Sequence, residues 1–134
     1  MKMRIDRLVS AAALTLSLAA CGDTSGPPVP KPGDLTLKLA LPASDDRAML
    51  VTISGPEAIG TITAAGPAYT VFGRPSGTTA KVAVFGTLVA GPVVKFAVPD
   101  VNKADQYTAA VTEVAGSANQ LRPQLTGYSV TVAK

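Results

Sequence analysis

Alternating apolar and polar residues dominate the chain from residue 35 onward. Every second residue from 35 to 41 is leucine, and Pro42 ends the run. Such period-two alternation predicts a β-strand with one buried face and one solvated face. Similar runs recur at intervals of roughly ten residues and end at glycine or proline. The eight candidate strands are 35–41, 48–54, 59–64, 69–72, 79–85, 93–98, 106–114 and 128–133.

These runs predict an all-β fold, namely a single antiparallel β-sandwich of about 7–9 short strands with a jelly-roll or Ig-like arrangement. The alanine-rich segment 104–118 admits a helix as the alternative. Its Tyr, Thr and Val residues favour a strand, because aromatic and β-branched side chains suit a pleated surface. We expect the three phenylalanines Phe72, Phe85 and Phe96 to lie in the core.

The first twenty residues have a different pattern. A basic start with Lys2, Arg4 and Arg7 precedes an uncharged, largely apolar run from 8 to 20. A membrane-spanning helix needs about 20 such residues, so this run is too short to span and has the size of a signal-peptide core. A signal peptide over 1–20 is therefore predicted, and a buried or interfacial helix of the mature fold is the alternative.

The end of that run carries a more specific motif. Leu18-Ala19-Ala20-Cys21 resembles the lipobox of bacterial lipoproteins, a likeness that covers the first 22 residues. The resemblance implies that a signal peptidase recognises Leu18, Ala19 and Ala20 and cleaves before Cys21, which carries fatty acyl chains such as palmitate. A single acyl chain binds a membrane only marginally, whereas two or three form a stable anchor. A free thiol at Cys21 is the alternative reading.

The lipobox resemblance also bears on location. It implies lipid anchoring in the bacterial cell envelope through Cys21. In enteric bacteria, Asp directly after the lipidated cysteine favours retention in the inner membrane, but Gly22 occupies that position here. By this analogy the outer membrane is favoured over the inner membrane.

A proline-rich segment separates the cysteine from the predicted strands. Residues 22–33 read GDTSGPPVPKPG, and prolines favour an extended polyproline II path. We expect a tether over 21–33 that includes the lipidated cysteine and reaches up to roughly 35 Å, followed by the β-sandwich domain at 34–134. A ligand for a proline-recognising domain is the alternative use of this segment.

The composition excludes several classes of chemistry. The chain has no histidine, which rules out Ser-His and Cys-His nucleophiles and His-ligated metals. One cysteine rules out an internal disulfide and a Cys-rich zinc site. After cleavage, nine basic and eight acidic side chains leave a balance of +1, so no concentrated basic face argues for nucleic-acid binding. We expect no cofactor.

Two acidic segments are the candidates for site chemistry. Adjacent Asp45 and Asp46 could ligate a cation or act as an acid–base pair, but a solvated turn partly neutralised by Arg47 is favoured. Asp100, Asn102 and Asp105 offer oxygen ligands, yet they lack the glycine and terminal glutamate of an EF-hand loop. An Asx turn is the favoured use of Asp100, and no metal site is predicted.

Three tyrosines are the candidates for glycan stacking. Tyr69, Tyr107 and Tyr128 could form a platform for sugar rings, although a strand tyrosine more often packs its ring and hydrogen-bonds its hydroxyl.

A second resemblance covers most of the domain. The segments 48–53, 94–98 and 107–114 are similar in order to strands of cohesin-type and carbohydrate-binding-module sandwiches. The resemblance implies a general interaction role. We therefore predict a lipid-anchored, non-catalytic interaction or structural module of the cell envelope, whose partner is an envelope protein or a glycan. The alternatives are a carbohydrate-binding module for envelope glycans and, less favoured, a small envelope hydrolase that uses Asp45, Asp46 or Asp105.

Overall fold

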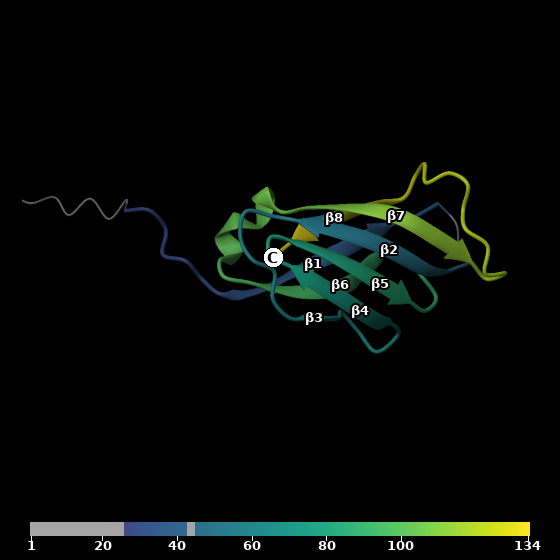
Figure 1. The fold of residues 1–134 in the computed structure, drawn as a ribbon, viewed down its shortest axis with the longest axis horizontal. Helices are drawn as coiled ribbons and strands as arrows, with labels where there is room; N and C mark the ends of the chain where they lie inside the picture. The colour runs from purple at the N-terminus through teal and green to yellow at the C-terminus, as the bar shows by residue number, and fades with distance from the viewer. Residues whose placement is uncertain (1–25, 43–44) are drawn as a thin grey trace, which may run out of the picture.

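The computed structural model describes residues 26–42 and 45–134, which form two antiparallel sheets packed face to face (Figure 1). The first sheet has four strands in the order β3-β6-β1-β8, and the second has four in the order β4-β5-β2-β7. The first sheet comprises β3 (Ile62–Ala64), β6 (Gly91–Val98), β1 (Gly33–Ala40) and β8 (Ser129–Ala133). The second comprises β4 (Thr70–Ser76), β5 (Thr79–Phe85), β2 (Asp46–Ser54) and β7 (Thr108–Gly116). The predicted all-β antiparallel sandwich is confirmed.

The core lies between the sheets and follows the alternation in the sequence. Leu35, Leu37 and Leu39 of β1 are buried, and they face the buried side chains of Met49, Val51 and Ile53 of β2. Phe96 of β6 is fully buried and packs against the ring of Tyr107 at a centroid distance of 5.8 Å. Each such aliphatic side chain contributes about 1.5–3 kcal/mol on burial, so the period-two pattern itself drives the two sheets together.

The chain crosses between the sheets at almost every connection. Only β4 and β5 are consecutive strands of one sheet, and a tight turn at Gly77, with φ of +61°, joins them. A positive φ suits glycine because it has no Cβ. The other connections run from sheet to sheet and therefore gather at the two ends of the sandwich.

A short 3-10 helix, η1 (Val101–Gln106), precedes β7. Within the segment 104–118, the predicted strand is present as β7, whereas residues 104–106 belong to η1. Asp100 caps η1 by accepting a hydrogen bond from the backbone N–H of Asn102, which confirms the predicted Asx turn.

At one side of the sandwich, β3 of the first sheet packs against β4 of the second sheet. Gly73 of β4 lies under Ile62 of β3, and a Cβ at Gly73 would come within 2.6 Å of that side chain. The strand β4 is an edge of its sheet and contains Pro75, which has no N–H to offer to another strand. The two sheets thus approach closely here, and Pro75 removes one hydrogen-bond donor from β4.

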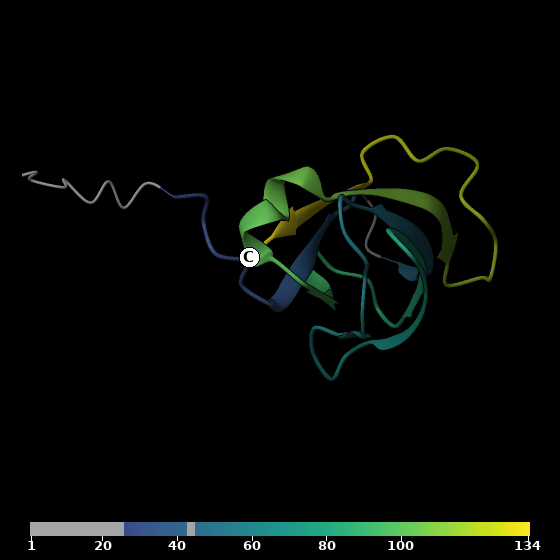
Figure 2. The same ribbon diagram turned by 60° about the vertical axis from the view of Figure 1, so that its left-hand side comes forward.

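The two ends of the sandwich differ in what they carry. The tether end holds residues 26–33, η1 and the last strand residues (Figure 1). The far end is the opposite one, where β2 begins and where β5 and β7 end. Figures 1 and 2 both place the long connection 117–128 at the far end, away from the tether.

Candidate interaction surface

The outer face of the first sheet is polar. One row of residues across it contains Thr63, Lys95, Thr36 and Ala133, as the strand register places them side by side. The next row toward the far end contains Lys38 and Thr131. This face has the composition of an ordinary solvated surface.

The outer face of the second sheet is graded from apolar to polar. The register of β4, β5, β2 and β7 defines four successive rows, counted from the far end. The first two rows are mostly apolar, the third row contains two cations, and the fourth consists only of hydroxyl side chains. The rows are Thr70–Phe85–Ala48–Ala115, Phe72–Ala83–Leu50–Glu113, Arg74–Lys81–Thr52–Ala110 and Ser76–Thr79–Ser54–Thr108.

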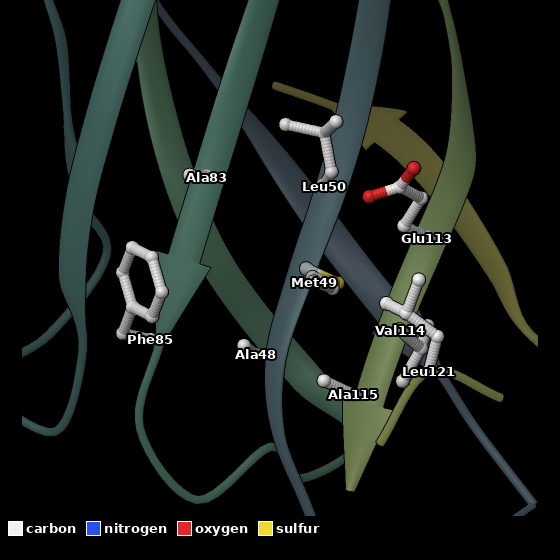
Figure 3. A pocket seen from close by; sticks show the side chains of 9 residues that line it. All are labelled: Ala48, Met49, Leu50, Ala83, Phe85, Glu113, Val114, Ala115 and Leu121. Carbon is white, nitrogen blue, oxygen red and sulfur yellow. The ribbon is translucent and has the colours of Figure 1, made fainter. Parts of the chain in front are cut away.

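A shallow hollow occupies the apolar rows (Figure 3). Its volume is about 220 Å³. The small side chains of Ala48, Ala83 and Ala115 leave room over the strands, while larger side chains stand around it. The surrounding residues include Phe85, Leu50, Glu113 and Leu121.

Two phenylalanines of this face were expected in the core, and that expectation is wrong. Phe72 is 65% exposed and Phe85 is 45% exposed, and their rings meet edge to face at 6.0 Å. The core side of their strands is already filled by Val71 and Val84, so the alternation forces both rings outward. Of the three phenylalanines, only Phe96 is in the core.

An ion pair between the buried Asp46 and the partly exposed Arg122 helps to hold the connection that supplies Leu121. Arg122 Nε donates to Asp46 Oδ1 at 2.8 Å, and the Tyr128 hydroxyl donates to Asp46 Oδ2 at 2.6 Å. The backbone N–H of Arg122 also donates to the carbonyl of Val114 in β7 at 2.7 Å. Leu121 is thereby held against the end of β7, where it forms a bridge with Ala115.

The predicted solvated turn at Asp45 and Asp46 is therefore wrong for Asp46. Asp46 is the first residue of β2 and is fully buried, while Asp45 is the more exposed partner of the same guanidinium. A buried carboxylate needs a partner, and Arg122 and Tyr128 provide it. The Arg47 side chain does not pair with the Asp46 carboxylate but donates to the backbone carbonyl of Asp46.

The same contacts move two pKa values. The hydrogen bond to Asp46 is the main cause that raises the pKa of Arg122, and Asp45 adds to it. Desolvation, followed by the hydrogen bond to Asp46, raises the pKa of the Tyr128 hydroxyl. Both groups keep their protons at neutral pH. The hydrogen-bond network of Asp46, Arg122 and Tyr128 therefore persists at neutral pH.

The tether is bonded to the domain before β1 begins. Asp100 Oδ1 accepts from the backbone N–H of Lys31 at 3.0 Å, and the N–H of Val101 donates to the Lys31 carbonyl at 2.8 Å. The Asn102 amide donates to the Val29 carbonyl at 3.3 Å. The N–H of Lys31, followed by that of Asn102, lowers the pKa of Asp100.

A second polar cluster lies at the tether end. Lys103 Nζ contacts Glu57 Oε1 at 2.5 Å, and this bond raises the pKa of Lys103. The Tyr107 hydroxyl donates to the Glu57 carbonyl at 3.4 Å, while desolvation raises the pKa of Tyr107. The cluster ties the connection before β3 to η1.

The three tyrosines do not meet. Tyr107 is buried at the tether end, whereas Tyr69 and Tyr128 lie half-buried at the far end. The Tyr69 hydroxyl accepts from the N–H of Val89, and that of Tyr128 is bound to Asp46. The described residues thus form no shared tyrosine platform.

The acidic candidates are likewise dispersed. Asp46 belongs to the far end, and Asp100 and Asp105 belong to the tether end. Among residues 26–42 and 45–134, no three His, Cys, Asp or Glu residues gather in a way that could hold a metal ion.

Leu18, Ala19, Ala20 and Cys21, the predicted peptidase and lipidation residues, lie outside the described residues. Within the described part, none of the helices has the length and apolar character needed to cross a membrane.

The comparisons with known proteins return nothing: no family model, curated protein or solved structure matches the chain.

Sequence reasoning missed the roles of Arg122 and Leu121. Arg122 is 76 residues from Asp46 in the chain, and no local pattern indicates that the two side chains meet. A signal for the exposed ring did exist at Phe85, because the alternation of β5 assigns it to the same side as the charged Lys81.

Proposed function

We propose that this chain is a lipid-anchored protein of the bacterial cell envelope whose β-sandwich is a non-catalytic interaction module. The anchor is Cys21, and the interaction surface is the outer face of the second sheet. The observation that supports this most directly is the position of the exposed apolar side chains. Of five large hydrophobic residues that are exposed in the described part, three, Phe72, Phe85 and Leu121, lie on or beside the far half of this sheet. Exposed apolar residues that gather in this way mark interaction sites, whereas scattered ones do not.

The placement of the hollow fits an anchored protein. The tether leaves the domain at the opposite end (Figure 1), so a partner can reach the apolar rows while lipid holds Cys21. Gly22, rather than Asp, after the cysteine favours the outer membrane.

A binding role is favoured over a hydrolytic one by the placement of the candidate acids Asp45, Asp46 and Asp105. Asp46 is fully buried and engaged by Arg122 and Tyr128, and Asp45 binds the same guanidinium. Asp105 belongs to η1 at the tether end, so it forms no acid–base pair with Asp45 or Asp46 at the far end. A protein partner is favoured over a glycan because the tyrosines are separated.

Photo-crosslinking in intact envelopes tests the proposed surface. A photoreactive amino acid in place of Ala83, in the hollow, is expected to give one discrete higher-mass adduct in cells that produce the protein. The matched control carries the same amino acid in place of Lys95, on the outer face of the first sheet, and is expected to give none. Equal adducts from both positions, or none from position 83, would contradict the proposal.

A further inference from the structure

We infer that the partner of this surface is a protein segment in extended conformation that carries a large apolar side chain and, on the same side, an aspartate or glutamate. The inference builds on the proposed interaction function and specifies the chemistry of its partner.

The apolar part of the inference comes from the hollow. Its volume of about 220 Å³ is below the 300–1,000 Å³ that is usual for small-molecule sites. It is open, and alanines leave its space while Phe85 and Leu121 stand on opposite sides of it (Figure 3). A space of this size and lining suits an anchoring side chain such as Leu or Phe from a protein partner.

The acidic part comes from the third row of the same face. Arg74 of β4 and Lys81 of β5 are directly opposite each other, and both are exposed. Like charges in directly opposite positions destabilise a sheet. Among the described residues, neither side chain takes part in an ion pair, so their positive charge is directed to solvent. A carboxylate of a partner would relieve their mutual repulsion.

The spacing joins the two parts into one recognition element. Successive rows on one face are about 7 Å apart, the distance between alternate residues of an extended chain. A segment that runs along the strands therefore places an apolar residue over the hollow and a residue two or four positions away beside Arg74 and Lys81. Glu113 lies at the β7 side of the hollow, so the carboxylate of the partner is expected on the β4–β5 side.

Charge also distinguishes this partner from a second copy of the chain. Two copies packed through this face would bring four cations, Arg74 and Lys81 of each chain, together with only the two Glu113 carboxylates of its rows, so that positive charge would remain in excess at the interface. The concave form of the hollow likewise favours a protruding side chain over the flat surface of a membrane.

Peptide selection tests the inference with a defined probe. The full-length chain with Cys21→Ser is immobilised and used to select from a phage-displayed library of random short peptides. The selected sequences are expected to be enriched in an apolar residue with Asp or Glu two or four positions away. Synthetic copies of them are then titrated against three variants of the same chain.

The variants separate the contributions of shape and charge. Ala83→Trp fills the hollow and is expected to abolish binding. Lys81→Glu is expected to weaken binding about tenfold by reversing one of the two cations. Lys95→Glu is the matched charge reversal on the other face and is expected to change affinity less than about twofold. Thermal unfolding of Lys81→Glu should show a protein at least as stable as the parent, because the new carboxylate faces Arg74.

Each contrary outcome is informative. Selected peptides without acidic residues, or equal effects of Lys81→Glu and Lys95→Glu, overturn the inference, while sensitivity to Ala83→Trp would still support the proposed surface. If Ala83→Trp weakens the binding of no selected peptide, both the inferred partner chemistry and the proposed interaction surface are contradicted. The parent chain could instead bind vesicles of anionic phosphatidylglycerol and lose that binding in Ala83→Trp, which would assign the face to a membrane. It could also form a dimer in solution that Ala83→Trp abolishes, which would assign the face to a second copy. Either result would overturn the inference.

Discussion

Asp46 links three segments that are far apart in the chain. Its two oxygens are taken by Arg122 and Tyr128, and its backbone carbonyl accepts the N–H of Leu88 at 3.0 Å. Removal of an acceptor leaves its buried donors without a partner, which costs more than the hydrogen bonds contribute. The Asp46 carboxylate therefore adds a side-chain link to the connection 117–128, which backbone bonds to the end of β7 also hold beside the hollow.

Asp46→Ala is expected to lower the free energy of unfolding by about 1–3 kcal/mol, since the Tyr128 hydroxyl loses its acceptor and the partly exposed Arg122 guanidinium keeps only Asp45. Asp45→Ala is the matched control, because it removes the exposed carboxylate of the same guanidinium, and its effect should stay below about 1 kcal/mol. Urea denaturation of both variants measures the difference. Equal losses would show that burial of Asp46 carries no energetic weight.

Gly55 is required by a close approach rather than by a turn. A Cβ at this position would overlap the ring of Tyr107, which is buried and has no free space to move into. Gly55→Ala is expected to destabilise the domain by about 1–3 kcal/mol through overpacking. At Gly66 the added Cβ meets nothing, so Gly66→Ala should change stability by less than about 0.5 kcal/mol. Thermal unfolding of the pair gives the comparison, and similar melting temperatures would refute the overlap.

The short helix η1 holds the end of the tether to the domain. Asp100 caps it and at the same time accepts the N–H of Lys31, so the helix and the end of the tether share one carboxylate. The predicted spacer over 22–33 is thus bonded to the domain at Val29 and Lys31. These bonds fix residues 29–31 against the domain.

This shared carboxylate predicts a dependence on pH. The pKa of Asp100 is lowered from 3.8 in the folded state, so its contribution to stability is complete above that value and is lost as pH falls through the folded pKa. The difference in unfolding free energy between the parent and Asp100→Ala should therefore be largest near about pH 6 and shrink toward about pH 2. Hydrogen exchange at the Lys31 amide should accelerate in the variant. A difference that stays constant with pH would contradict the assignment.

The strands were predictable because each carries its own signature in consecutive residues. The alternation in 79–85 predicts both the extent and the facing of β5, whereas the leucines of 35–41 predict the facing of β1 but not its bounds, Gly33–Ala40. The network of Asp46, Arg122 and Tyr128 could not be predicted from consecutive residues, because Asp46 contacts side chains more than seventy positions away in the chain. For Phe72 and Phe85, apolar character suggested burial, but the position within the strand decided otherwise. Alternation is thus a better guide to facing than the type of a single residue.

The molecule as a whole has two opposed ends, one bonded to its tether and one bearing the apolar rows. The proposed role assigns these ends to an anchor and a partner, and the anchor can be tested on its own. In a bacterial host fed labelled palmitate, the parent chain should incorporate label and fractionate with membranes. Cys21→Ser should carry no label and retain the mass of its leader. A variant that is still processed and labelled would exclude the lipobox reading.

The same labelling experiment can test which membrane holds the protein. Gly22→Asp places an acid directly after the cysteine and, in an enteric host, should move the labelled protein from the outer to the inner membrane. Separation of the two membranes by density provides the measurement. An unchanged distribution would remove the basis for favouring the outer membrane.

The position of β1 determines how the domain would bear mechanical load. A pull between the anchor and a bound partner would first load the bonds of Val29 and Lys31 to the domain and would then run along β1 from Gly33, in the middle of its sheet between β6 and β8. The hydrogen bonds to both neighbours would then be strained together in shear, instead of breaking one after another as in a peeled edge strand. A surface protein held at one end and tugged at the other would therefore resist unfolding through the strand that its own tether leads into.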